Sequence, residues 1–163
     1  VAILWWLDVV PPGIGLLALV LLGAMLGFAV FNKHPASIFL GDSGSLPIGL
    51  ILAYMLIWVA EAHFVSALLL ALYTIADSAL TFVRRLRNGE KVTAAHRIHY
   101  YQRAIANGFQ VPEVTTRVFL LCGWLAILAI VAALAASPTA DAAALALGIA
   151  GVAFVLSSFA RGR

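Results

Sequence analysis

Long apolar runs separated by short polar connections dominate the sequence. The runs lie at about residues 13–31, 46–60, 64–83, 118–136 and 142–160. A helix needs about 20 mainly apolar residues to cross the hydrocarbon core of a bilayer, so these runs predict transmembrane helices. Residues 1–7 are apolar but too few to span, and we expect a partial N-terminal helix there. The pattern predicts an all-α integral membrane protein, a polytopic helix bundle forming a single transmembrane domain over residues 1–163.

The composition supports a membrane protein. The chain is 64% hydrophobic and 10% charged, with a mean hydropathy of +1.06. Soluble domains typically carry about 25% charged residues. Too little polar surface is therefore available to cover a water-soluble globule. The single cysteine, Cys122, lies in an apolar run, which excludes a disulfide framework and a cysteine-based zinc site.

The charges predict how the spans are oriented. All ten Lys and Arg residues fall in or beside alternate connections. The other connections hold Asp8, Glu61 and Asp141 and contain no Lys or Arg. The positive-inside rule then places the loops at 32–45 and 84–116 and the C-terminus on the cytoplasmic side. Four complete transmembrane helices separate these cytoplasmic parts, so the two polar loops share one membrane face.

The polar connection at residues 32–45 reads NKHPASIFLGDSGS. Gly41 allows a tight turn before Asp42, because glycine adopts backbone conformations that a side chain forbids. Ser45 is expected to cap the next helix, with Pro47 tolerated in the first turn. The sequence therefore predicts a tight turn that leads into the N-terminus of a spanning helix.

Such a turn suits a metal and a phosphate side by side. Free amides and the positive end of a helix dipole favour phosphate, and we expect Gly41, Ser43 and Gly44 to contact substrate. The Asp42 carboxylate is a hard oxygen ligand for Mg²⁺, with Mn²⁺ as an alternative. The simpler interpretation is that Asp42 only caps a helix. G-D-S-G also surrounds the nucleophile of trypsin-like serine proteases, but those are antiparallel β-barrels.

Residues 94–109 predict a short amphipathic helix in the second cytoplasmic loop. Thr93 can cap this helix, and Gly108 can end it. Its apolar stripe would consist of Ile98, Tyr101, Ile105 and Phe109. A stripe of this kind indicates a helix that lies on the membrane surface.

The other face of this helix would carry polar side chains. They are His96, His99, Tyr100 and Arg103, with Arg97 beside them. Arginine binds phosphate oxygens bidentately, so the group suits a pyrophosphate or nucleotide. Two alternatives stay open. The helix could bind anionic lipid, or the two histidines could bind zinc, although no third or fourth ligand is evident.

Asp77 is an acidic residue inside the apolar run at 64–83. Ionisable residues within a span are costly and indicate function by default. At helical spacing, Thr81 and Arg84 would lie on the same face as Asp77. The alternative is that Asp77 pairs with Arg84 or a hydroxyl group and locks the helices together.

Three motifs together resemble those of the polyprenyl-phosphate N-acetylhexosamine-1-phosphate transferases of glycosyltransferase family 4. They are N-x-x-P-A-x-x-F-L-G-D-S-G-S from Asn32 to Ser45, D-x-x-x-T-x-x-R-R from Asp77 to Arg85, and A-H-R-x-H-x-Y-Q-R from Ala95 to Arg103. The resemblance covers essentially the whole chain. The third motif is more similar to the O-antigen and exopolysaccharide-initiating branch than to the peptidoglycan branch, which carries a run of histidines there.

The resemblance implies a multi-pass, Mg²⁺-dependent enzyme of the bacterial inner membrane with a cytoplasmic active face. It would transfer N-acetylhexosamine 1-phosphate from a UDP-sugar to undecaprenyl phosphate and release UMP, in the first membrane step of cell-surface polysaccharide synthesis. The implied metal ligand is Asp42, which with His96, His99 and Asp77 makes up the catalytic positions. The implied substrate-binding positions are Asn32, Arg97, Tyr100 and Arg103. For Asp77 the resemblance gives an acidic position without a settled role.

Two motifs of this family do not occur in the sequence. No two acidic residues are adjacent, and there is no N-x-x-D-G. The simplest expectation is the C-terminal part of a longer enzyme, inactive alone, although a truncated gene product or a split enzyme fits the same residues. The alternative function is a non-catalytic membrane scaffold whose basic cytoplasmic face binds anionic lipid or a partner. We expect contact with membrane lipid and none with nucleic acid, and a homodimer stays open.

Overall fold

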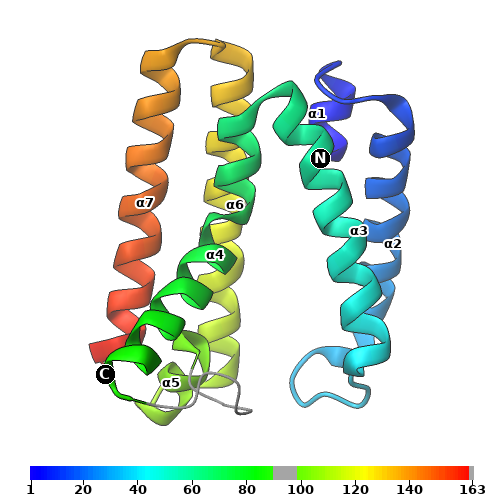
Figure 1. Ribbon diagram of the computed structural model, residues 1–163. Coiled ribbons are helices and arrows are strands. Elements are labelled where there is room, and N and C mark those ends of the chain that lie inside the picture. Colours follow the sequence, from blue (N-terminus) through cyan, green and yellow to red (C-terminus); the bar gives the residue numbers. More distant parts are fainter. Residues whose placement is uncertain (90–98, 162–163) are drawn as a thin grey trace. The chain divides into compact units, whose positions relative to one another are not determined.

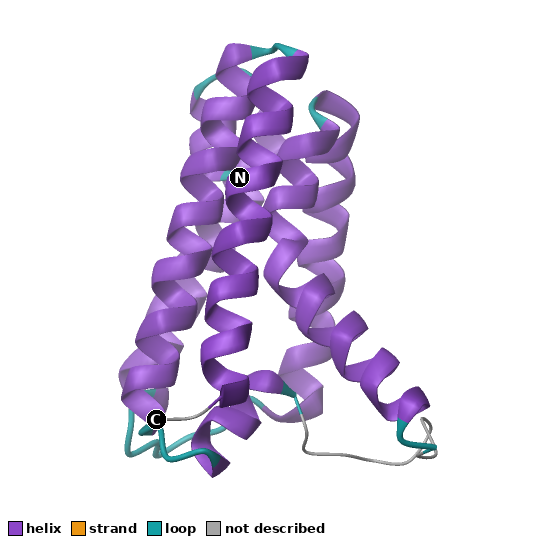
Figure 2. Cartoon of the chain, turned by 90° about the vertical axis from the view of Figure 1, so that its left-hand side faces the viewer, coloured by secondary structure: helices purple, strands orange, loops and turns teal. Residues whose placement is uncertain are grey.

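The computed structural model describes residues 1–89 and 99–161. In these two ranges the regular structure consists of helices, and no strand is present (Figure 2). In chain order (Figure 1) they are α1 (Ala2–Trp6), α2 (Pro12–Asn32), α3 (Gly41–Ala62), α4 (Phe64–Arg87), α5 (Tyr100–Ala106), α6 (Val111–Ala135) and α7 (Pro138–Arg161). The all-α class predicted from the sequence is confirmed.

Five of the described helices are long and apolar enough to cross a membrane: α2, α3, α4, α6 and α7. They match the five apolar runs, and the five-residue helix α1 matches the expected partial N-terminal helix. Several spans are longer than their apolar runs. Helix α3 begins at Gly41, and α6 begins at Val111, so the second polar loop is shorter than expected. Polar residues continue these helices because a helix can extend beyond the hydrocarbon core into the headgroup region.

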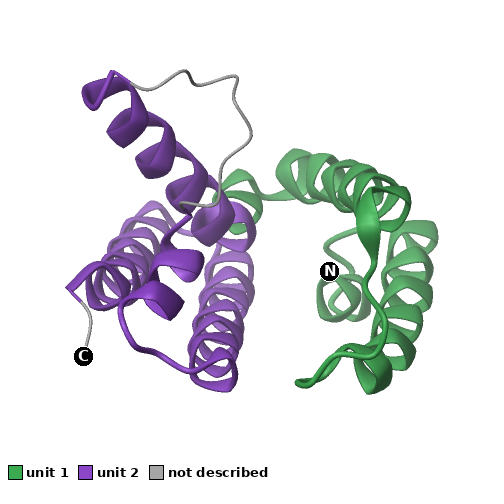
Figure 3. Ribbon diagram, turned by 90° about the horizontal axis from the view of Figure 1, so that it is seen from below, with its two compact units in different colours: residues 1–68 green, residues 69–163 purple. Residues whose placement is uncertain are grey.

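The chain forms two compact units, residues 1–68 and residues 69–163 (Figure 3). Unit 1 contains α1, α2, α3 and the first turn of α4, and α1 packs against α2 in it. Leu4, Val10 and Ile14 are buried there. Unit 2 contains the rest of α4 and helices α5, α6 and α7. The single transmembrane domain expected over the whole chain stays a prediction.

The core of unit 2 lies between α6 and α7, which run side by side (Figure 1). Small residues make this contact close: Ala129 and Ala132 on α6 are fully buried, and Ala144 on α7 is nearly so. Lipid tails are as apolar as leucine, so helices in a membrane associate mainly through such close packing. At one end of the pair, α5 packs against both helices. There Ala104 and Phe109 contact Val114 and Phe159, and the two phenylalanine rings meet edge to face.

The close packing of α7 predicts different outcomes for two glycines. A Cβ atom at Gly148 would lie 2.7 Å from Cδ2 of Leu69 and 3.2 Å from Cδ2 of Leu125, whereas one at Gly151 would meet nothing closer than 3.4 Å. Alanine raises helix propensity equally at both positions. We therefore expect Gly148→Ala to be less stable than Gly151→Ala by about 1–3 kcal/mol, the usual range for overpacking. Thermal unfolding in detergent measures this difference, and equal midpoints would contradict it.

Candidate functional site

The polar loop after α2 is closed by hydrogen bonds to the end of that helix. Asn32 is the last residue of α2, and its Nδ2 donates to the carbonyl of Ile38 at 2.9 Å. The Ser37 hydroxyl and the Ser37 amide both donate to the carbonyl of Phe31, each at 2.9 Å. Asn32 therefore has a structural role in shaping the loop. Its expected contact with substrate stays a prediction.

Asp42 lies in the first turn of α3, and its side chain is exposed. The helix begins at Gly41, which has a φ of 62°, a left-handed conformation that favours glycine. Ser45 is therefore inside the helix, and the expectation that Ser45 caps it is wrong. The helix begins five residues earlier than expected, at Gly41 instead of residue 46. Asp42 is thus the second residue of α3, with Ser43 and Gly44 following it in the same turn.

Pro47 interrupts the regular hydrogen bonding of α3 one turn after Asp42. Pro47 lies inside α3 and has no amide hydrogen, so it cannot donate the bond that the Ser43 carbonyl would accept in a regular helix. Carbonyl and carboxylate oxygens are both ligands for hard cations. Mg²⁺ is usually held by one or two carboxylates together with water and substrate phosphates. An exposed carboxylate such as Asp42 fits that arrangement, although residues 1–89 and 99–161 contain no group of three potential metal-binding side chains.

The second group of predicted site residues lies in unit 2, around Asp77. This carboxylate is on α4 and only 6% exposed. Its Oδ2 accepts a hydrogen bond from Nδ1 of His99 at 2.9 Å, and its Oδ1 accepts one from the amide of Tyr100 at 2.8 Å. The His99 amide donates to Oε1 of Gln102 at 3.1 Å. Asp77 therefore joins α4 to the start of α5.

Helix α5 is shorter than the sequence pattern predicted. His99 is its N-cap, with an extended backbone (φ −57°, ψ 153°), so a continuous helix through His99 is wrong. His96 and Arg97 lie outside the described residues, and their predicted roles stay predictions. The end of the helix is as expected at Gly108. There the Phe109 amide donates to the carbonyl of Ala104 at 3.0 Å, which closes the last turn.

The buried face of α5 also differs from the predicted apolar stripe. Tyr101 and Ile105 are exposed, whereas Ala104 is fully buried and Tyr100 packs beside it. Packing against α6 and α7 selects this face, and the spacing of apolar residues alone did not reveal it. The Tyr101 ring stacks on the His99 ring with their centroids 6.0 Å apart. The Arg103 guanidinium lies 5.5 Å from the centre of the Tyr100 ring, so His99, Tyr100 and Arg103 form one group at the start of α5.

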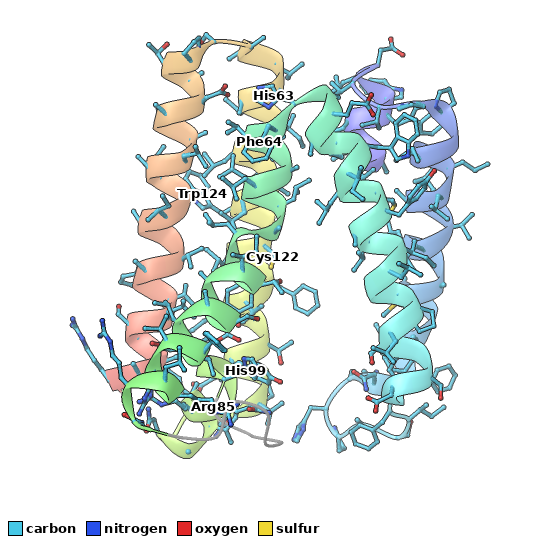
Figure 4. The ribbon with its side chains drawn as sticks, viewed as in Figure 1. His63, Phe64, Arg85, His99, Cys122 and Trp124 are labelled. Carbon is cyan, nitrogen blue, oxygen red and sulfur yellow. The ribbon has the colours of Figure 1, made fainter. Side chains whose placement is uncertain are left out.

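Further polar side chains lie on α4 between Asp77 and the C-terminal end of the helix. Thr81 and Arg85 are buried, 3% and 4% exposed, whereas Arg84 is exposed. The expectation that Arg84 shares the face of Asp77 stays a prediction, because seven residues are about two helical turns. The buried arginine at this end of α4 is Arg85, which the sequence did not single out. His99 and Arg85 lie at the same end of unit 2 (Figure 4).

An apolar groove of about 320 Å³ lies between α4, α5 and α6. Its lining includes Tyr73, Tyr101, Val118, Phe119 and Cys122. Tyr101 connects the groove to the polar group, since its ring also stacks on His99. The sequence did not predict this groove. Most of its lining residues lie in apolar spans, and the groove forms only where α5 packs beside those spans.

Comparison with known proteins identifies the family. Residues 1–60 match the model of glycosyl transferase family 4. Decaprenyl-phosphate N-acetylglucosaminephosphotransferase of Mycobacterium tuberculosis is 31% identical over 173 residues, which cover 93% of this chain and 41% of that protein. The chain belongs to glycosyl transferase family 4. No solved structure matches it.

Two further relatives are similar over shorter stretches. A probable undecaprenyl-phosphate N-acetylglucosaminyl 1-phosphate transferase of Bacillus subtilis is 33% identical over 97 residues, 56% of this chain and 27% of that protein. Phospho-N-acetylmuramoyl-pentapeptide-transferase of Flavobacterium johnsoniae is 31% identical over 121 residues, 67% of this chain and 28% of that protein. The chain thus spans less than half the length of each of these three relatives.

The left-handed backbone at Gly41 predicts which substitutions the start of α3 tolerates. An L-residue other than asparagine or aspartate costs about 1–2 kcal/mol in this conformation. We expect Gly41→Ala to loosen the first turn, and Gly41→Asn to loosen it less. Hydrogen exchange of the amides of Ser45, Leu46 and Ile48 in the full-length protein measures this. Equal exchange rates in the two variants would contradict the prediction.

Proposed function

We propose that this chain takes part in the transfer of N-acetylhexosamine 1-phosphate from a UDP-sugar to a polyprenyl phosphate, with release of UMP. The observation that carries the proposal is the similarity to the mycobacterial decaprenyl-phosphate transferase over 93% of the chain. In a bacterium, this reaction would be the first membrane step of cell-surface polysaccharide synthesis, with undecaprenyl phosphate as acceptor. The activity is that of the full-length protein.

Asp42 would hold the Mg²⁺ ion in this reaction. A divalent cation bound next to phosphate oxygens neutralises the charge that develops during phosphoryl transfer. The exposed carboxylate in the first turn of α3 supports this role. Amides at the start of α3 would orient substrate phosphates, and Gly41, Ser43 and Gly44 supply part of that turn.

The group around His99 would bind the charged part of a substrate. The Arg103 guanidinium and the His99 imidazole are groups that bind phosphate oxygens. The groove lined by Tyr73, Val118 and Phe119 is apolar and begins at Tyr101, beside His99. A polyprenyl phosphate combines a charged head with an apolar chain, so this arrangement suits such an acceptor.

The proposed site residues of each unit would face the cytoplasm of a bacterium, with the chain in the inner membrane. The loop that carries Asp42 and the connection that carries His99 both belong to the basic connections of the sequence. UDP-sugars are cytoplasmic, so the reaction requires that face. Asn32, Tyr100 and the residues His96 and Arg97 would complete the substrate contacts.

The role of Asp42 predicts the effect of removing its charge. We expect Asp42→Asn in the full-length protein to lower Mg²⁺-dependent UMP release by at least about 100-fold, because the amide is a weak ligand for a hard cation. The measurement is UMP release from a UDP-N-acetylhexosamine with undecaprenyl phosphate in detergent micelles.

Asp8→Asn is the matched control for this experiment. Asp8 is an exposed aspartate of unit 1 with a φ of 57°, a conformation that asparagine also tolerates, and it lies outside the G-D-S-G motif. We expect this variant to keep wild-type activity. If Asp42→Asn also stays within a few-fold of wild type, the metal site is elsewhere. A protein that binds anionic vesicles but releases no UMP would instead support the scaffold.

A further inference from the structure

The polar group of unit 2 contains a buried carboxylate that contacts two consecutive residues of another element. Asp77 on α4 accepts hydrogen bonds from His99 Nδ1 and from the Tyr100 amide, 22 and 23 residues along the chain. Its side chain is 8% exposed and that of His99 is 28% exposed. Asp77 therefore lies behind His99, and His99 is the member of the pair that a substrate can reach.

We propose that Asp77 is a positioning residue that fixes the tautomer and the orientation of the His99 imidazole; this inference rests on the proposed function. A carboxylate only accepts hydrogen bonds, so the hydrogen in this contact is on Nδ1. In the neutral ring the other nitrogen, Nε2, is then an acceptor. Asp77 thus sets which of the two ring nitrogens of His99 carries the hydrogen.

The backbone contacts hold the imidazole in place as well. The Tyr100 amide binds Asp77 Oδ1, and the His99 amide binds Gln102 Oε1, so the backbone on both sides of the His99 Cα is tethered. The Tyr101 ring stacks on the imidazole with an interplanar angle of 17°. A ring held at its Nδ1, at its backbone and on one face has little freedom to turn.

Thr81, the next buried polar residue along α4, makes no comparable contact with α5 in the described residues. Thr81 is one turn from Asp77 and equally buried, yet its hydroxyl has no hydrogen-bond partner in the part of the chain that is described. The contact with α5 is therefore specific to Asp77 and does not extend to every polar residue along this face. Thr81→Val gives a matched control in the same helix.

The decisive variant is Asp77→Asn in the full-length protein. The asparagine Oδ1 can still accept from the Tyr100 amide, so the tether between α4 and α5 is kept. Its Nδ2 donates, so His99 Nδ1 must become an acceptor and the hydrogen moves to Nε2. We expect kcat for UMP release to fall about 10- to 100-fold, as for other residues that orient an active-site histidine. KM for the UDP-sugar should stay unchanged, and Thr81→Val should keep wild-type kcat.

A double-mutant cycle separates positioning from a merely structural role. In a His99→Ala background, we expect Asp77→Asn to cause no further loss of kcat, because the group on which it acts is gone. If Asp77→Asn lowers kcat by the same factor in both backgrounds, or does not lower it in the wild type, the proposal is overturned. It is also overturned if His99→Ala keeps full activity, an outcome that leaves the proposed transfer reaction standing.

The tautomer itself provides a test that needs no activity. The imidazole ¹⁵N chemical shifts of the wild-type protein distinguish a hydrogen on Nδ1 from one on Nε2, with His99 assigned by its loss in His99→Gln. We expect the Nδ1–H form in the wild type and in Thr81→Val, and the Nε2–H form in Asp77→Asn. An Nε2–H form in the wild type overturns the proposal even if Asp77→Asn fails to fold. If the wild type releases no UMP, the transfer reaction is refuted and the shifts still test the pair.

Discussion

A carboxylate inside a membrane-spanning helix is stable only where protein groups satisfy its oxygens, because lipid supplies no hydrogen bonds. Asp77 meets this constraint through α5, which offers one side-chain and one backbone donor. The consequence extends beyond Asp77. The carboxylate determines where α5 begins and holds the His99 ring beside α4. The same start of α5 also fixes the position of Tyr100, the first residue of the helix, whose ring contacts the Arg103 guanidinium.

Asp42 is an aspartate in the opposite environment. It is exposed in the first turn of α3, among amides that favour negative charge, and it follows a glycine in a left-handed conformation. The charge of Asp42 is thus available to a ligand, whereas that of Asp77 is used within the protein. The two aspartates would have been given the same role from their residue type alone. Their surroundings support the proposals that Asp42 binds a metal ion and that Asp77 positions His99.

The helices of unit 2 provide the rigid support for the polar group. Alanines of α6 and α7 pack closely, and α5 is held across their end by Phe109 and Phe159. The Asn107 side chain adds a bond to the carbonyl of Phe159 at 2.8 Å, which satisfies an acceptor at the end of α7. A short helix such as α5 is unstable alone, so these contacts explain how seven residues hold a defined position.

The sequence by itself determined the class of the protein and the five spans, because crossing a bilayer requires a length of apolar residues that can be counted along the chain. It also singled out Asp42, Asp77 and His99, since polar residues in such a chain are rare and costly. Only the tertiary structure decided where α3 and α5 begin, that Arg85 rather than Arg84 is buried, and that Asp77 binds His99. The start of α3 follows from the backbone conformation at Gly41, whereas the other features depend on helix packing between residues far apart in the chain; apolar periodicity encodes neither.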